Sequence, residues 1–220
     1  MLEIESFEEL PRSGTPRANR GTMLLARRTR TLVLSTFLLL GASLASPRTE
    51  ATPATRNVER FAVKVPNSSL EAGAARVLVQ APSETARSVV TDYGRYSSII
   101  THFKNARIVG RAGSQTDVYL EVPILNGAAK IWAVVRFAPP ETQGTQEIVR
   151  GRLLKGNIKR LDATWRIEKV DEKKSVLSLE LLMVPDLPAP NSLISGELRK
   201  AAGKAVNAAR NEAEQRLRRS

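Results

Sequence analysis

Residues 191–220 read Asn-Ser-Leu-Ile-Ser-Gly-Glu-Leu-Arg-Lys-Ala-Ala-Gly-Lys-Ala-Val-Asn-Ala-Ala-Arg-Asn-Glu-Ala-Glu-Gln-Arg-Leu-Arg-Arg-Ser. Apolar residues recur in this stretch at intervals of three and four, the spacing of one helix face: Ile194, Leu198, Ala201, Ala202, Ala205, Ala209 and Ala213. Asn191 is a candidate N-cap, and the closing arginines lie where the helix dipole favours cations. We predict a single helix about 40 Å long, enough to cross a small domain.

The apolar face of this predicted helix consists mostly of alanine after Leu198. A helix that only fills a core would more often carry leucine or isoleucine there. Small side chains either bring the helix backbone close to a sheet or leave room for a cavity beneath it. The stretch alone leaves both interpretations open, and the rest of the chain must decide between them.

Composition excludes several classes of site. The chain has no cysteine and one histidine, so a disulfide, a thiolate metal site, a cysteine nucleophile and a multi-histidine metal site are ruled out. We expect no metal and no cofactor. The net charge of +12 is spread along the chain, which favours a solvated basic surface, with an anionic membrane surface as the next partner to consider. Without a DNA-reading motif we expect no nucleic acid partner, and we expect a monomer.

Residues 23–45 resemble a signal peptide. Arg27, Arg28 and Arg30 precede an apolar run that ends in the small residues Ser43-Leu44-Ala45. We expect cleavage near Ala45 and export to the periplasm or the extracellular space. An uncleaved membrane anchor is the alternative, although the apolar run is short for a span. We interpret residues 1–22 as an extension from a mis-called start codon, residues 46–57 as a disordered linker, and residues 58–220 as the folded domain.

Alternating apolar and polar residues predict a run of strands before the long helix. A helix is expected from Ser83, as its cap, to Gly94, followed by a second short helix or a turn at 95–100. The predicted strands occupy residues 61–65, 75–79, 106–110, 117–122, 130–137, 147–153, 163–167 and 177–183. Helices segregated from antiparallel strands define an α+β domain, and the long helix is the element able to cover the apolar face of the sheet.

Short motifs add a family resemblance to this order of elements. The chain carries Ala81-Pro82, then Thr91-Asp92-Tyr93 and Tyr96, and over residues 74–216 it resembles the START-like (SRPBCC) superfamily, in its polyketide cyclase and coenzyme Q-binding branch. The resemblance implies a helix-grip fold: a curved antiparallel sheet of about six to seven strands wrapped around the C-terminal helix, with a hydrophobic cavity between them. Ser97-Ser98 departs from the family pattern, in which a proline and bulky aromatics are common.

The resemblance makes a hydrophobic small molecule or lipid the expected ligand, of the quinone, fatty acid or polyketide class, with lipid transfer as a possible role. Alternation then assigns the lining of the cavity to inward-facing residues of several elements: Ile99, Phe103, Leu120, Ala133, Val135, Trp165, Leu179, Leu181, Leu198, Ala202 and Ala205.

Two alternatives remain open. The first is a cyclase or dehydratase on the same fold, for which His102 is a weak catalytic candidate because it is the only imidazole. The second is an envelope interaction protein whose cavity is filled by side chains. By alternation Trp132 points outward, where it would cover an edge or contact a partner or membrane. Glu121, Glu147 and Glu180 are expected to face water.

Overall fold

The computed structural model describes residues 57–124, 129–186 and 188–219, and the predicted leader and nearly all of the linker lie outside them. In chain order the elements are β1 (Glu59–Val63), β2 (Ala72–Val79), α1 (Ser83–Val90), the 3-10 turn η1 (Tyr93–Arg95), α2 (Tyr96–Ile99), β3 (Asn105–Ala112), β4 (Gln115–Ile124), β5 (Ala129–Phe137), β6 (Glu141–Gln143), β7 (Gln146–Gly156), β8 (Ile158–Asp171), β9 (Lys174–Pro185) and α3 (Asn191–Arg219). Across these residues we find no helix with the length and apolarity needed to span a membrane.

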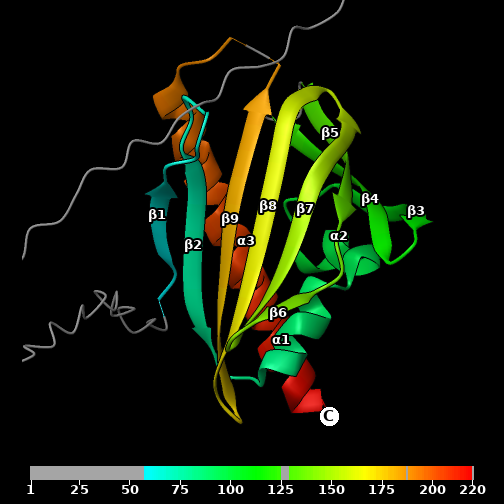
Figure 1. The fold of residues 1–220 in the computed structure, drawn as a ribbon, viewed down its shortest axis with the longest axis vertical. Coiled ribbons are helices and arrows are strands. Elements are labelled where there is room, and N and C mark those ends of the chain that lie inside the picture. Colours follow the sequence, from blue (N-terminus) through cyan, green and yellow to red (C-terminus); the bar gives the residue numbers. More distant parts are fainter. Residues whose placement is uncertain (1–56, 125–128, 187, 220) are drawn as a thin grey trace, which may run out of the picture. The chain divides into compact units, whose positions relative to one another are not determined.

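The strands form one open, curved antiparallel sheet in the order β1-β2-β9-β8-β7-β5-β4-β3, and the short β6 pairs with β7 (Figure 1). This arrangement confirms the α+β class and the helix-grip fold. The sheet has nine strands rather than six to seven. The two N-terminal strands pair with each other and belong to this same sheet, and β6, which has three residues, is too short to show alternation in the sequence.

The long helix α3 lies against the β1, β2 and β9 side of the sheet (Figure 1). Its contact face is fully or almost fully buried and consists of Leu198, Ala202, Val206, Ala209 and Ala213. At Gly73 of β2, an added Cβ would lie 2.2 Å from the carbonyl carbon of Leu198. The small residues of this face therefore serve close packing of helix on sheet, which is one of the two interpretations that the sequence left open.

Two details of the helix ends differ from the sequence expectation. Pro82, not Ser83, occupies the N-cap position of α1, and no side chain caps the helix. The helix ends at Val90 rather than at Gly94, and Tyr93 begins a separate 3-10 turn. At α3, the Asn191 side-chain amide donates to the Ser69 carbonyl (3.3 Å), so it ties the helix to the β1–β2 connection.

Candidate functional site

The concave face of the sheet is apolar throughout, but its burial differs from one end to the other. Beneath α1, its side chains have no exposed surface; they include Val77, Val79, Val149, Ile167 and Leu177. Away from α1, apolar side chains packed against the same core stay only half-buried, and we call them the open strip: Phe103, Ile131, Leu153, Leu161, Leu181 and Met183.

Strand register places the members of the open strip beside one another. Met183 of β9 faces Leu161 of β8, and Leu181 faces Ala163 on the same two strands. Leu153 of β7 pairs with Val135 of β5, and Ile131 lies on the same face of β5. The strip therefore crosses the concave face from β9 to β5, at the end farther from α1.

The structure brings most of the predicted lining residues together. Eight belong to one continuous buried cluster drawn from four strands and two helices, and two more, Phe103 and Leu181, pack against it half-buried. The eight are Ile99, Leu120, Ala133, Val135, Trp165, Leu179, Ala202 and Ala205. Leu198 is buried as well, but on the face of α3 that approaches Gly73. Ile131, Leu153, Leu161 and Met183 were not predicted, although the first and last share the alternation of their predicted neighbours.

A flank of α3 beside its contact face carries a second row of alanines. Ala201, Ala205 and Ala208 follow one another at helical spacing, and Ala201 and Ala208 are half-buried. One turn further along this flank, Glu212 forms an ion pair with Arg95 of η1 (3.3 Å). The flank therefore faces α2 and the concave surface rather than β2. Its small alanine side chains leave room beneath the helix, which is the second of the two interpretations that the sequence left open.

Aromatic residues close the buried end of the concave face. The Tyr93 ring stacks on Phe137 with 4.5 Å between centroids, and the Tyr96 ring stacks on Phe103 at 6.0 Å. The Tyr96 hydroxyl donates to the Val90 carbonyl (2.5 Å), and the Trp165 indole hydrogen-bonds to Tyr96. Burial raises the pKa of both tyrosines, so their hydroxyls stay protonated, and the Tyr96 hydroxyl serves as a structural hydrogen-bond donor.

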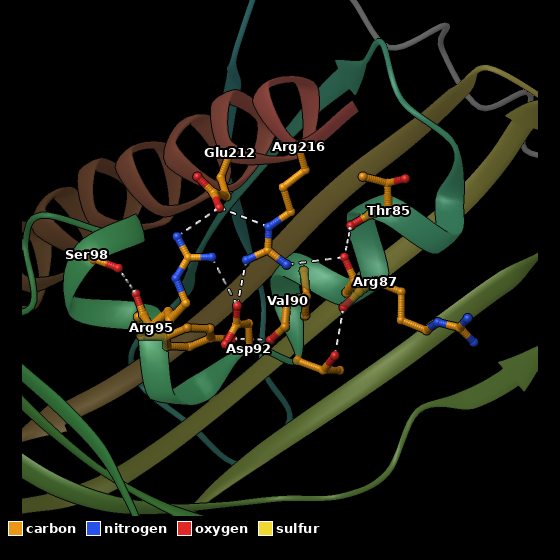
Figure 2. A network of polar contacts seen from close by, with 11 residues as sticks. Thr85, Arg87, Val90, Asp92, Arg95, Ser98, Glu212 and Arg216 are labelled. Carbon is orange, nitrogen blue, oxygen red and sulfur yellow. Dashed lines mark hydrogen bonds and ion pairs between the residues drawn. The ribbon is translucent and has the colours of Figure 1, made fainter. Parts of the chain in front are cut away.

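An ion-pair network, which we call the clasp, joins the C-terminal half of α3 to η1 (Figure 2). Arg216 donates to Asp92 (2.6 Å) and to Glu212 (2.9 Å), and its third nitrogen reaches the Ser88 hydroxyl (3.4 Å). Arg95 adds longer contacts to the same two carboxylates. The Thr91-Asp92-Tyr93 motif thus has a structural use: Asp92 holds α3, and Tyr93 holds β5 through Phe137.

The structure gives His102 an exposed position after α2. Partial burial lowers the pKa of its imidazole, the nearby Lys204 lowers it further, and Glu197 opposes both. Glu180 pairs with Arg166 and Glu121 with Lys130, as expected for outward positions, but Glu147 does not face open water, because it forms an ion pair with Arg87 of α1 (3.4 Å). Among the described residues, no cluster of histidine and carboxylate side chains is suited to a metal ion.

Two cavities formed by described residues lie away from the predicted lining. The larger, about 560 Å³, lies between the β1–β2 connection and the first turns of α3; its lining includes Lys64, Ser68, Ser195 and Arg199. The smaller, about 230 Å³, lies over the Tyr93 and Phe137 rings at the β3 edge. None of the predicted lining residues contributes to either cavity.

A curved antiparallel sheet closed around a long C-terminal helix defines a START-like, helix-grip protein. The model of a protein family described as polyketide cyclase / dehydrase and lipid transport matches residues 79–210, and the chain belongs to this family. The comparison with curated protein sequences found no match.

Three solved structures illustrate the shared fold. A STAR-related lipid transfer protein from Xanthomonas axonopodis is 16% identical, with a TM-score of 0.63 over 75% of this chain and 97% of that chain. Human STARD10 is 12% identical, with a TM-score of 0.63 over 76% of this chain and 73% of that chain. A START superfamily protein from Mycobacterium smegmatis is 20% identical, with a TM-score of 0.52 over 66% and 96%. At these identities the likeness is one of fold.

Proposed function

We propose that this chain is an exported START-like domain that binds a hydrophobic small molecule or lipid between the concave face of the sheet and the alanine flank of α3. The single observation that carries the proposal is the open strip. Its apolar side chains remain partly exposed on a face whose other end is fully closed. Leaving such a surface in water is unfavourable, and an apolar ligand would remove it from solvent.

The chemistry of the strip favours a ligand that is mainly hydrocarbon. Leu161, Leu181 and Met183 offer no hydrogen-bond donor, and the flexible thioether of methionine adapts to irregular ligands. A ligand that buries about 300 Å² of apolar surface would gain about 7 kcal/mol before the entropy cost of association. Fatty acids, quinones and polyketides all meet this requirement, and the family description includes lipid transport.

A binding role fits the described residues better than catalysis does. His102 is exposed, and partial burial and the nearby Lys204 lower the pKa of its imidazole. Among the described residues, no carboxylate is hydrogen-bonded to this ring to orient it as a general base. Burial raises the pKa of Tyr93 and Tyr96, so both hydroxyls stay protonated, and the Tyr96 hydroxyl is already bonded to the Val90 carbonyl. Export is proposed from the leader-like residues 23–45, and sequencing the N-terminus of protein isolated from its host tests it, with Ser46 as the expected first residue.

Native mass spectrometry of the protein isolated from its host tests the ligand proposal. We expect a bound apolar molecule, and we expect Ala208→Trp to lower the fraction of protein that carries it, because the indole would occupy the space beside the open strip. Gln215→Trp, at an exposed position of the same helix, is the matched control and should keep full occupancy. Parent protein without any ligand, or equal occupancy in both variants with unchanged circular dichroism, would contradict the proposal.

A further inference from the structure

The convex face of the sheet carries an exposed apolar centre where β4, β5 and β7 lie side by side (Figure 1). Tyr119 of β4 and Trp132 of β5 stack with 6.2 Å between ring centroids. Leu154 of β7 is 47% exposed. The register joins these residues into one surface, because Tyr119 pairs with Val134 and Val134 pairs with Lys155, the neighbour of Leu154.

Strand alternation and one register shift turn side chains outward here. Alternation on β7 puts Leu154 on the same outer face as Arg152, and the shift between Val134 and Val135 then brings Lys155 to that face opposite Val134. On the edge strand β3, a second shift leaves Val109 as an extra residue that is 47% exposed, whereas Ile108 pairs with Val118 and lies on the inner face. The outer surface here is therefore set by strand register rather than by isolated side chains.

Positive charge surrounds this centre. The Arg107 guanidinium lies 4.9 Å from the centre of the Tyr119 ring, and Lys130 and Lys155 are exposed on the neighbouring strands. Two carboxylates lie on this face of β4: Glu121 accepts from the Tyr119 hydroxyl (2.7 Å) and from Lys130 (3.4 Å), and Asp117 accepts from Arg136 (2.7 Å). The hydrogen bond from Tyr119 lowers the pKa of Glu121, so it stays ionised, and the cations remain in excess.

We propose that this outer patch, formed by Arg107, Tyr119, Lys130, Trp132, Leu154 and Lys155, docks the domain onto an anionic lipid bilayer. Tryptophan and tyrosine side chains favour the headgroup region, where an apolar ring and a polar tip are both accommodated. Lysine and arginine around them pair with lipid phosphates, and Leu154 enters the acyl boundary. The inference goes beyond ligand binding, because the outer patch lies on the opposite face of the sheet from the open strip.

Two other partners fit the outer patch less well. Single-stranded nucleic acid needs free aromatic faces on which bases can stack, but the Tyr119 ring already contacts Arg107 and Trp132. An acidic protein would satisfy the cations but would leave the exposed Leu154 without a contact. Both partners are therefore outcomes that the experiment must separate from a bilayer.

The experiment measures binding of the full chain to vesicles of phosphatidylglycerol mixed with phosphatidylcholine. Phosphatidylcholine vesicles are the neutral reference. The chain has two tryptophans, and Trp165 is only 3% exposed, so a change of emission on binding reports Trp132. We expect binding to the anionic vesicles, weakening with salt, a blue shift of the emission, and quenching by brominated acyl chains.

Matched variants locate the contact. Lys155→Ala should weaken vesicle binding about fivefold, the usual contribution of one cation at such a surface. Leu154→Ser should weaken it about tenfold through lost apolar burial. The controls are Lys173→Ala in the β8–β9 turn and Val170→Ser near the end of β8; both positions are exposed, and both variants should bind as the parent does. Residues 1–56 are common to all five proteins, so their contribution cancels.

The proposal is overturned by any of three results: no binding to anionic vesicles, binding without a change in Trp132 emission, or equal losses in the patch variants and their controls. If the protein binds single-stranded RNA or an acidic polypeptide more tightly than vesicles, that molecule and not the bilayer is the partner of the outer patch. Leu154→Ser should keep the occupancy of the apolar ligand, so a failure of membrane docking is distinguishable from a failure of the ligand proposal.

Discussion

Replacing Gly73 by alanine tests the contact on which the fold depends. The added Cβ would lie 2.2 Å from the carbonyl carbon of Leu198 and 2.3 Å from the amide nitrogen of Arg199. Ordinary contact between such atoms is about 3.5 Å, so β2 and α3 must separate by about 1 Å. Overpacking typically costs about 1–3 kcal/mol, and we expect the upper end because both partners are backbone rather than flexible side chain.

Thermal unfolding followed by circular dichroism measures this cost. For a domain of this size, about 3 kcal/mol corresponds to a fall in Tm of about 6–12 °C. Gly196→Ala is the matched control, since Gly196 lies within α3 and a Cβ there meets no atom within 4 Å. Because alanine has a higher helix propensity than glycine, Gly196→Ala should raise the free energy of unfolding by about 1 kcal/mol. A Gly73→Ala protein that melts with the parent would show that α3 does not lie on β2 as described.

Two further predictions concern the clasp and the buried tyrosines. Arg216→Met should lower the free energy of unfolding, measured in urea titrations, by about 1 kcal/mol, and by a smaller amount at high salt. Arg218→Met, at an exposed position, should have no effect. Equal effects of the two substitutions would show that the clasp does not stabilise the fold. Burial raises the pKa of Tyr93, so above its ordinary value of about 10 the unfolded state releases its proton first and stability falls as pH rises, by up to about 1.4 kcal/mol per pH unit. Tyr93→Phe should make this alkaline fall shallower, and an unchanged slope would contradict the assignment.

The sequence predicted the inward side of most strands correctly, because alternation reports which side chains leave water. Leu120, Ala133, Trp165 and Leu179 all lie in the buried cluster, as their spacing indicates. The long helix was equally predictable, since no proline or glycine pair interrupts its periodicity. Alternation indicates which face of the sheet each side chain occupies. This was enough to predict the fold class and a list of candidate lining residues.

Other features depend on contacts between distant segments. Glu147 was expected to face water, yet its ion pair with Arg87 requires α1 to lie over the start of β7, which no local pattern reveals. Lys155 lies on the outer face because of a register shift that involves the neighbouring strand. The end of α1 at Val90 follows from the stacking of Tyr93 on Phe137, a residue more than forty positions later. Pairing partners and register are tertiary properties, so they were not predictable from spacing.

The close approach of Gly73 to Leu198 also has a consequence for the order in which the domain matures. The two residues belong to the second strand and to the final helix of the described chain, so the apolar face of β2 stays uncovered while everything between them is synthesised. Pairing across such sequence separation is slow, and the unshielded strands are prone to aggregate in the interval. A growing chain of this kind should depend on a chaperone until α3 arrives.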